Sequence, residues 1–392
     1  MGKGKGGKGS RSARRHRTSA ADATAFELPA IGLMSDLPAF SDLRVDDTQT
    51  AAFTDFRSQF DQASGGQAAS HLQIGGVIRL DRGFPLVATP DVTLRSEHAV
   101  AFAKRGADEE PLLPAIGDIV AVRVDPGHDK GVIEAVLPRR TAFERWRGKS
   151  RGECQVLAAN VDVILIVQPL GSSRDSESLV RDRIARSLVL VNDCGAVPVV
   201  VFTKADRSDP AARDRAIRDA CALAGEGVRV IVTSSRDGLG LDEVRACVPA
   251  GACGMILGES GAGKSTLLNA LLGHDALATG AVRERDDMGR HTTVARVMCK
   301  LPGPHGVIAD APGLRSLPLV GHELGLARTF PDVARASRGC RFSDCTHTHE
   351  PGCAVRGAVD AGEIDAVRVE AFLALAREMR VSAQSLDPDV RL

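Results

Sequence analysis

Hydrophobic and polar residues alternate in two different ways along the 392-residue chain. In the first half, short apolar runs are separated by turn residues, as at Gly75-Gly76 and Asp125-Pro126-Gly127. Short strands at such spacing are typical of a small antiparallel barrel, for which the OB type is one candidate. Barrels of this kind either bind RNA or serve as spacers. The expected strands cover residues 73–80, 84–89, 92–103, 117–124 and 131–137.

From residue 161 onward, apolar runs of strand length alternate with stretches of helical periodicity. This alternation predicts a parallel sheet covered by helices, and we expect all these strands to form one doubly wound α/β domain. The expected strands are 161–167, 197–202, 228–232, 254–257, 293–300 and 306–309, and the expected helices lie near 177–193, 210–224, 240–247 and after Lys264.

Composition narrows the possible functions. Basic and acidic residues balance at 50 each, but residues 1–25 form a basic tail that we expect to be disordered. Such a tail either neutralises nucleic-acid phosphates or only solubilises the protein. Aromatic residues make up 3% and Tyr is absent, which argues against binding of single strands by base stacking. The basic stretch 138–152 is expected to be a linker or an RNA-facing edge.

The chain also lacks signals for a membrane or an export route. No apolar run reaches the roughly 18 residues that a membrane span needs. The basic start is not followed by the apolar core of a secretory signal. We therefore expect a cytoplasmic protein with reduced thiols and no membrane contact.

One motif binds nucleotide phosphates. Gly258-Glu259-Ser260-Gly261-Ala262-Gly263-Lys264-Ser265, followed by Thr266, is a complete phosphate-binding loop between an expected strand and an expected helix. Its glycines let backbone N–H groups converge on phosphate oxygens, and the helix N-terminus adds partial positive charge. Lys264 is expected to reach the β- and γ-phosphates, and Ser265 to offer its hydroxyl to Mg²⁺.

Two further segments have the composition of nucleotide-sensing switches. The strand at 306–309 ends in Asp310-Ala311-Pro312-Gly313, where Asp310 can hold Mg²⁺ and Gly313 can donate to the γ-phosphate. The polar loop Gly289-Arg290-His291-Thr292-Thr293 offers Thr292 or Thr293 for contacts with Mg²⁺ and the γ-phosphate. The sequence does not choose between the two threonines.

A third segment is suited to selecting the base. Thr203-Lys204-Ala205-Asp206 follows an expected strand, and Asp206 can accept hydrogen bonds from the N1–H and N2–H₂ groups of guanine. Adenine lacks these donors, so GTP is favoured over ATP. Thr203 replaces the usual Asn and is shorter, so one contact to the base or to the phosphate loop is expected to weaken. Backbone N–H groups near Ser234 and Ser235 are expected to meet guanine O6.

These motifs follow an unusual order. The base-reading segments precede the phosphate loop and the switches, whereas standard GTPases have the reverse order. A circular permutation preserves the same sheet because domain termini often lie close together. The last switch then leads directly toward the C-terminal region.

The C-terminal region contains a candidate metal site. Cys340, Cys345, His347 and Cys353 supply three thiolates and one imidazole, a closed tetrahedral set for one structural Zn²⁺. His349 is a competing but less well placed ligand.

Together the permuted motifs, the barrel and the Cys-x4-Cys-x-His-x5-Cys pattern resemble the bacterial ribosome small-subunit-dependent GTPase A (RsgA) family over residues 70–375. The resemblance implies a late maturation checkpoint factor that binds the 30S subunit and its 16S rRNA and hydrolyses GTP when the subunit stimulates it. It also implies a catalytic role for His291 in orienting water, because Leu314 stands where Ras-like enzymes place Gln.

Two rival functions stand beside the one that the resemblance implies: an ATP-driven P-loop enzyme, and an RNA-binding assembly scaffold with incidental hydrolysis. A monomer is expected. The expected parts are the tail 1–25, a helical extension 26–70, an OB-fold RNA-binding domain 71–140, a permuted GTPase domain 150–320, and a zinc-binding helical domain 321–392.

Overall fold

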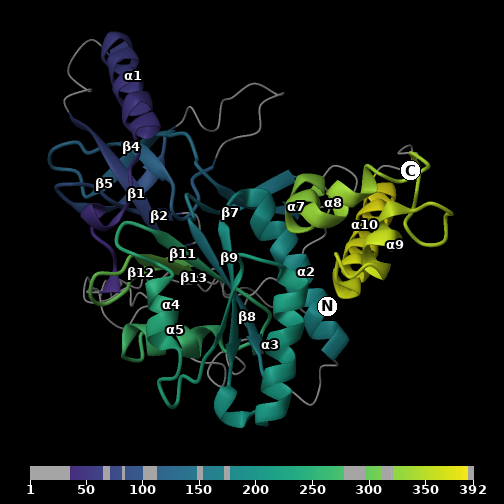
Figure 1. Cartoon of the computed structure of the whole chain (residues 1–392). Coiled ribbons are helices and arrows are strands. Elements are labelled where there is room, and N and C mark those ends of the chain that lie inside the picture. The colour runs from purple at the N-terminus through teal and green to yellow at the C-terminus, as the bar shows by residue number, and fades with distance from the viewer. Residues whose placement is uncertain are drawn as a thin grey trace, which may run out of the picture.

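The barrel, the central sheet and the C-terminal helices lie side by side across the molecule (Figure 1). The computed structural model describes residues 36–64, 71–81, 84–99, 113–147, 153–171, 177–277, 296–310, 319 and 321–386. Within these ranges, no helix combines the length and the apolar character that crossing a bilayer requires.

The predicted barrel is present and closed. Its strands pair in the order β1-β2-β3-β5-β4, and β4 returns to pair with β1, which is an OB-type arrangement. β3 is described only to its end at His98, so the rest of the expected strand 92–103 lies largely outside the described residues. The strands are β1 (Leu72–Asp81), β2 (Phe84–Ala88), β3 (Thr93–His98), β4 (Ile119–Arg123) and β5 (Lys130–Val136).

The central sheet confirms the predicted α/β architecture. Its order is β10-β9-β8-β11-β13-β12, parallel throughout except that β12 runs antiparallel to β13. The strands are β8 (Val163–Pro169), β9 (Val197–Thr203), β10 (Arg229–Val232), β11 (Cys253–Leu257), β12 (Arg296–Lys300) and β13 (Val307–Asp310).

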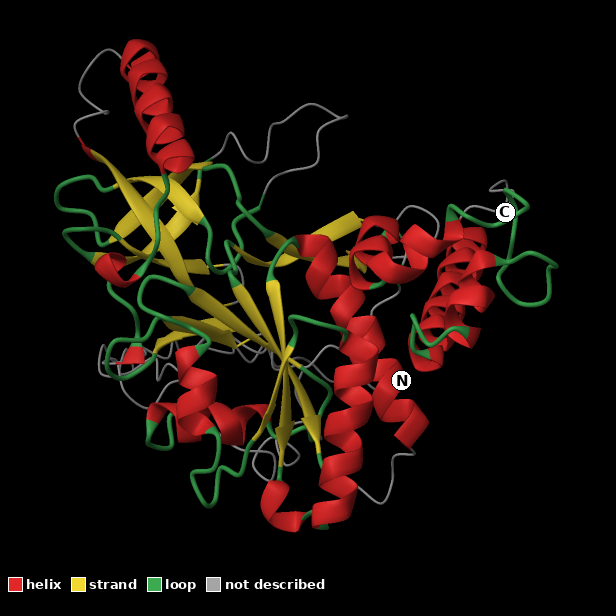
Figure 2. Ribbon diagram, in the orientation of Figure 1, coloured by secondary structure: helices red, strands yellow, loops and turns green. Residues whose placement is uncertain are grey.

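Helices cover both faces of this sheet (Figure 2). One apolar cluster joins a sheet face to α2 and α3, and another joins the opposite face to α4 and α5. Burial of both faces explains why these strands are continuous apolar runs rather than alternating ones. The helices are α2 (Glu177–Cys194), α3 (Pro210–Ala224), α4 (Leu241–Ala246) and α5 (Lys264–Leu272).

The barrel and the central sheet share one hydrogen-bonded ladder. The end of β1 pairs with β12 at Arg79↔Val297 and Leu80↔Arg296, so eleven strands form a single sheet. The barrel is thereby attached to the strand beside β13, the strand that ends at Asp310.

The basic stretch 138–152 was expected to be a linker or an RNA-facing edge, and the linker alternative was wrong. β6 (Ala142–Arg147) lies within this stretch and pairs antiparallel with β7 (Glu153–Ala159), which follows it. Phe143 is buried and pairs with Ala158, so the strand has an apolar inner side. The many charged residues of this stretch concealed a period-two pattern, because the alternate positions of a half-buried strand tolerate charge.

A buried polar network fixes the N-terminal helix α1 (Asp47–Ser64) to the joint between the barrel and the central sheet. Gln49 Nε2 donates to Pro138 O at 3.0 Å and to Asn160 Oδ1 at 3.2 Å. Asn160 also accepts from the Arg140 N–H and donates to Gly117 O, each at 2.9 Å. Gln49 and Asn160 are buried, so these hydrogen bonds specify how the three parts meet.

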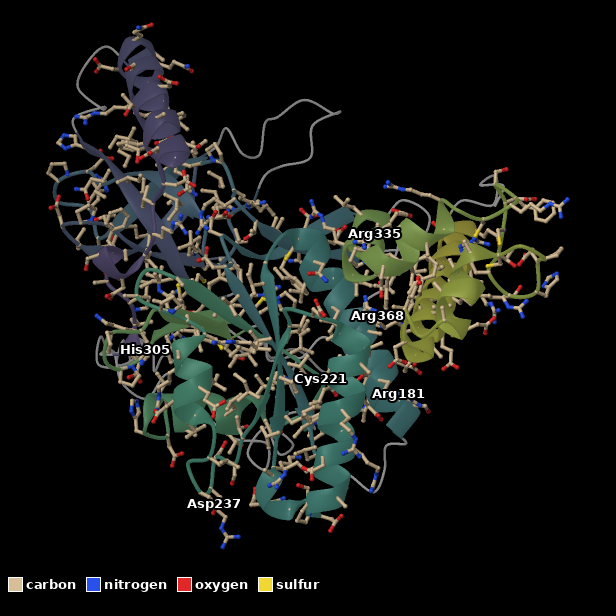
Figure 3. The ribbon with its side chains drawn as sticks, viewed as in Figure 1. Arg181, Cys221, Asp237, His305, Arg335 and Arg368 are labelled. Carbon is tan, nitrogen blue, oxygen red and sulfur yellow. The ribbon has the colours of Figure 1, made fainter. Side chains whose placement is uncertain are left out.

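Four helices form a C-terminal module beside α2 and α3. They are α7 (Glu323–Thr329), α8 (Pro331–Ser337), α9 (Ala354–Asp360) and α10 (Ala366–Leu386). Arg368 lies at the centre of the contact (Figure 3). Its guanidinium donates to both oxygens of Asp332, to Thr329 O and to Leu223 O at the end of α3. The buried charge is therefore paired and hydrogen-bonded.

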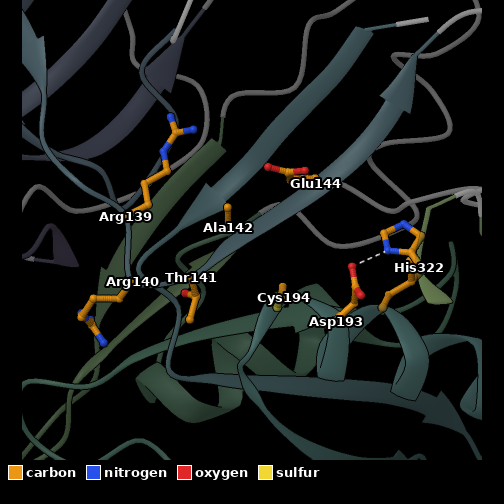
Figure 4. A pocket seen from close by; sticks show the side chains of 9 residues that line it. Arg139, Arg140, Thr141, Ala142, Glu144, Asp193, Cys194 and His322 are labelled. Carbon is orange, nitrogen blue, oxygen red and sulfur yellow. Dashed lines mark hydrogen bonds and ion pairs between the residues drawn. The ribbon is translucent and has the colours of Figure 1, made fainter. Parts of the chain in front are cut away.

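A second contact joins α7 to the end of α2. Asp193 Oδ2 lies 2.7 Å from His322 Nδ1, and Asp193 Oδ1 accepts from the Gly325 N–H at 2.9 Å. The Asp193–His322 pair lines a cavity of about 290 Å³ that is also bordered by β6 (Figure 4). This cavity contains none of the predicted nucleotide-binding residues.

Candidate functional site

The phosphate loop lies between β11 and α5, at the carboxyl edge of the sheet. A Cβ at Gly258 would lie 2.6 Å from Val167 O, so only glycine fits there. Gly261 and Gly263 have φ of 82° and 91°, a region that favours glycine. The predicted glycines are therefore required by the shape of the loop.

Lys264 lies inside this loop and is 8% exposed. Its Nζ donates to Gly258 O at 2.8 Å and to Glu259 O at 2.7 Å. A buried ammonium group at a helix N-terminus attracts an anion, because both the charge and the helix dipole are positive there. The loop is thus arranged for phosphate oxygens to compete for the Lys264 donors.

Asp310 lies at the end of the neighbouring strand and is 4% exposed. It pairs with Ile256 on one side and with Val297 on the other. Both of these residues pack in the cluster that contains α5, and directly paired residues project from the same face of a sheet. The Asp310 carboxylate is therefore on the face where α5 begins with Lys264 and Ser265, as a shared Mg²⁺ site requires.

The predicted base-reading segment contacts the phosphate loop directly. Thr203, at the end of β9 and 3% exposed, donates from Oγ1 to Ala262 O at 2.7 Å. Lys204, with φ of 62°, donates from Nζ to Gly261 O at 2.8 Å. Thr203 therefore keeps a contact to the phosphate loop although it is shorter than Asn. Two segments that the permutation separates in sequence form one site.

Asp206 has a partner that the sequence did not indicate. Ser234 Oγ lies 3.3 Å from Asp206 Oδ1 and 2.9 Å from Asp237 Oδ2, and the Asp206 side chain is 14% exposed. The Ser234 N–H donates to Leu239 O at 3.1 Å, so this group is engaged away from any base. The contact expected with guanine O6 then falls to Ser235. Asp237 was missed because nothing in the sequence distinguishes it from an ordinary turn residue.

Some predicted residues have no described surroundings. His291, Thr292, Thr293 and Gly313 lie outside the described residues, as does the basic tail. Thr266 and Ser260 are exposed at the start of α5 and in the loop. The described half of the nucleotide site therefore consists of the phosphate loop, Asp310 and the base-reading segment.

The four predicted metal ligands gather at one point. Their ligand atoms, Cys340 Sγ, Cys345 Sγ, one ring nitrogen of His347 and Cys353 Sγ, lie within 4.8 Å of one another. Cys340 Sγ is 3.9 Å from Cys353 Sγ, and His347 Nδ1 is 3.5 Å and 3.6 Å from these two sulfurs. Tetrahedral Zn²⁺ with Zn–S near 2.3 Å and Zn–N near 2.0 Å requires ligand atoms about 3.5–3.8 Å apart. The cluster therefore fits zinc.

His349 is not part of this cluster, and its Nδ1 lies 2.9 Å from Thr348 Oγ1. The loop is held instead by Glu350, whose Oε1 accepts from the Thr346 N–H at 2.9 Å. Hydrogen bonds from the side chain and backbone of Thr346 hold the pKa of Glu350 well below its usual range. An ionised Glu350 thus fixes the turn that carries His347.

The remaining described cysteines do not form a second cluster of metal ligands. Burial raises the pKa of both Cys253 and Cys299 to about 12 and that of Cys194 to about 11, so these thiols stay protonated. Cys221 is exposed on α3.

The fold and the site define a P-loop GTPase in which the base-reading strands precede the phosphate loop. The sequence model of the family described as RsgA GTPase matches residues 136–320. The chain is 42% identical over 313 residues to the small ribosomal subunit biogenesis GTPase RsgA of Streptomyces coelicolor, covering 79% of this chain and 81% of that protein. This chain belongs to the RsgA GTPase family, and it is a GTP hydrolase.

Solved structures agree with this assignment. The crystal structure of YjeQ from Thermotoga maritima matches with a TM-score of 0.59 at 25% identity, over 79% of this chain and 99% of that one. The structure of YloQ, titled a circularly permuted GTPase, matches with a TM-score of 0.56 over 82% of this chain and 98% of that one. At 23% identity, the second match concerns the fold alone.

Proposed function

We propose that this protein binds the 30S ribosomal subunit through its 16S rRNA, acts as a checkpoint late in subunit maturation, and hydrolyses GTP when the subunit stimulates it. The observation that carries this proposal is the junction of Thr203 and Lys204 with the phosphate loop, in a chain that covers 81% of a relative named for small ribosomal subunit biogenesis. This junction makes a guanine-reading segment part of the phosphate site, which disfavours the ATP-driven alternative.

The residues have separate roles in this proposal. Asp206 accepts from the guanine N1–H and N2–H₂ groups, with Ser234 orienting its carboxylate. Lys264 and the N–H groups of the phosphate loop bind the β- and γ-phosphates. Ser265 and Asp310 hold Mg²⁺, which neutralises charge that develops on the phosphates.

The switch residues complete the site. Thr292 or Thr293 and Gly313 respond to the γ-phosphate, and His291 orients water in place of the missing Gln. Hydrolysis is slow in the free protein and accelerates when the subunit binds.

The other parts serve binding to the subunit. The barrel, assigned to residues 71–140, and the basic tail 1–25 contact rRNA phosphates. The C-terminal domain, assigned to residues 321–392, is stabilised by one structural Zn²⁺ on Cys340, Cys345, His347 and Cys353. The permuted GTPase domain, residues 150–320, lies between them. The protein works as a cytoplasmic monomer.

The decisive experiment compares GTP turnover with and without purified 30S subunits. We expect a large stimulation; in other GTPases a partner accelerates hydrolysis by about 10³–10⁵-fold. Lys264→Ala is the control for contaminating activity and should show no stimulated turnover. If subunits leave the wild-type GTP turnover rate unchanged, the proposal is contradicted. If the affinity for subunits does not fall as the salt concentration rises, the proposed phosphate contacts are contradicted.

A further inference from the structure

Two arginines on one turn of α2 reach in different directions. Arg183 Nη2 lies 2.8 Å from Glu259 Oε2 in the phosphate loop. Arg186 forms an ion pair with Glu378 of α10. Residues three apart on a helix lie on the same face, so one turn of α2 contacts both the nucleotide site and the C-terminal module.

All four side chains border one cavity of about 380 Å³ between α2, the phosphate loop and α10. Its walls include Leu179, Leu257 and Leu375. Figure 1 places α10 beside α2, and Gly258 and Glu259 bring the edge of the phosphate loop to the same cavity. The phosphate loop and α10 thus lie on opposite sides of this cavity. Among the described lining residues, Arg183 and Arg186 of α2 connect the two sides through ion pairs.

Glu259 is held at two points. Its carbonyl oxygen accepts from Lys264 Nζ, and its carboxylate pairs with Arg183. The carboxylate contact with Arg183 does not involve Lys264, so it is independent of the donors that phosphate oxygens would compete for. The pair is thus suited to fixing the outer side of the loop while its inner side exchanges partners.

We propose that Arg183 is a positioning residue for the phosphate loop, and that Arg186–Glu378 and Arg183–Glu259 transmit the position of α10 to the nucleotide site through α2. The signal that moves α10 is docking of the C-terminal module on the small ribosomal subunit, and this part rests on the proposed function.

The coupling is tested first in the full-length protein without subunits. We compare amide hydrogen exchange of residues 258–263 in the wild type, Arg183→Gln, Glu378→Gln and Glu370→Gln. Glu370 is exposed on the same helix as Glu378 and serves as the matched control. Arg183→Gln and Glu378→Gln should both accelerate exchange by about two- to fivefold, the range expected for one partly exposed ion pair. Acceleration by Arg183→Gln but not by Glu378→Gln would overturn the coupling.

Kinetics separate positioning from a general loss of structure. Arg183→Gln should raise the KM for GTP by about two- to fivefold with little change in kcat, and Arg183→Lys should restore most of it because the charge remains. The exchanged pair Arg186→Glu with Glu378→Arg should return loop exchange to the wild-type rate. A KM unaffected by Arg183→Gln would show that Arg183 does not position the loop.

Stimulation by subunits completes the test. Glu378→Gln should bind 30S subunits as tightly as the wild type but lose at least about half of the stimulation, in line with the same ion-pair range. Full stimulation of Glu378→Gln would contradict transmission through α2. If subunits fail to stimulate the wild type, the proposed function falls, while the exchange measurement still decides whether α10 and the loop are coupled.

Discussion

The barrel and the C-terminal module are joined to the central α/β domain by different kinds of contact. The barrel continues the backbone ladder of the sheet through β1 and β12, and buried amides of Gln49 and Asn160 lock the joint. The module packs on α2 and α3 through a shared apolar cluster, and charged side chains, chiefly Arg368 and Asp193, add paired contacts between helices. We infer that the barrel moves with the sheet, whereas the module is held by side-chain packing and charged pairs, without a shared backbone ladder, and can be altered separately.

Removal of zinc should have the largest effect and should be confined to the module. A structural Zn²⁺ site contributes about 10–16 kcal/mol of apparent binding free energy, so Cys353→Ser or a strong chelator should unfold the segment around residues 340–353. Limited proteolysis should then cut the module while the barrel stays intact. Simultaneous cleavage of the barrel would show that the two joints are not independent.

Arg368→Met should detach the module next most strongly. The substitution leaves Asp332, Thr329 O and Leu223 O without their buried donor. Breaking a buried charged pair costs about 3–5 kcal/mol, so urea should release the module in a transition before the rest of the protein unfolds. Arg356→Met, at an exposed position on α9, is the control and should leave the transition unchanged.

Asn160→Ala should weaken the barrel joint by a smaller amount. Gln49, the Arg140 N–H and Gly117 O each lose one hydrogen bond to Asn160, and Ala is also strained at the Asn160 φ of 56°. We expect the free energy of unfolding to fall by about 2–3 kcal/mol. Asn160→Gly tolerates that φ and separates the backbone effect from the side-chain effect. Equal stability of Asn160→Ala and the wild type would show that the network does not hold the joint.

Acid should weaken the module gradually, as the smallest effect. Burial favours the protonated form of Asp332, but the hydrogen bonds and charge of Arg368 outweigh it and lower the pKa of Asp332 below 3.8. A lowered folded-state pKa contributes stability above the unfolded-state pKa, and this contribution is lost as the pH falls through the folded-state pKa. Urea midpoints of the module should therefore decline below about pH 4. Arg368→Met should remove most of this decline, and an undiminished decline would assign it to other groups.

The sequence predicted the features that depend on short segments of consecutive residues. The phosphate loop, the permuted order of the strands and the Cys/His cluster each follow from residues within a short segment or from the period of apolar positions. The effect of Thr203 in place of Asn was only partly predicted. Its hydrogen bond to Ala262 O joins segments far apart in the chain, so the retained contact could not be foreseen.

The rest depends on contacts that no local pattern encodes. Arg368 and Arg183 are ordinary helix arginines by sequence, and their partners come from other elements. The hairpin at 142–159 was missed because charge density was weighed above the alternation around Phe143. Long-range pairing of polar groups is set by packing, and local sequence does not reveal it.

The central claim, that the permuted order builds a guanine site around Asp206, is tested most directly by Asp206→Asn. Guanine presents donors at N1 and N2 to the carboxylate, whereas xanthine has an acceptor oxygen at C2 that suits the amide N–H of Asn. We predict that kcat/KM for GTP falls by about 100-fold or more, because the Asn NH2 faces the guanine N2–H₂ donor and the remaining hydrogen bond from N1–H loses its charged acceptor, and that XTP becomes the better substrate. A variant that still prefers GTP, at a kcat/KM close to that of the wild type, would contradict the account.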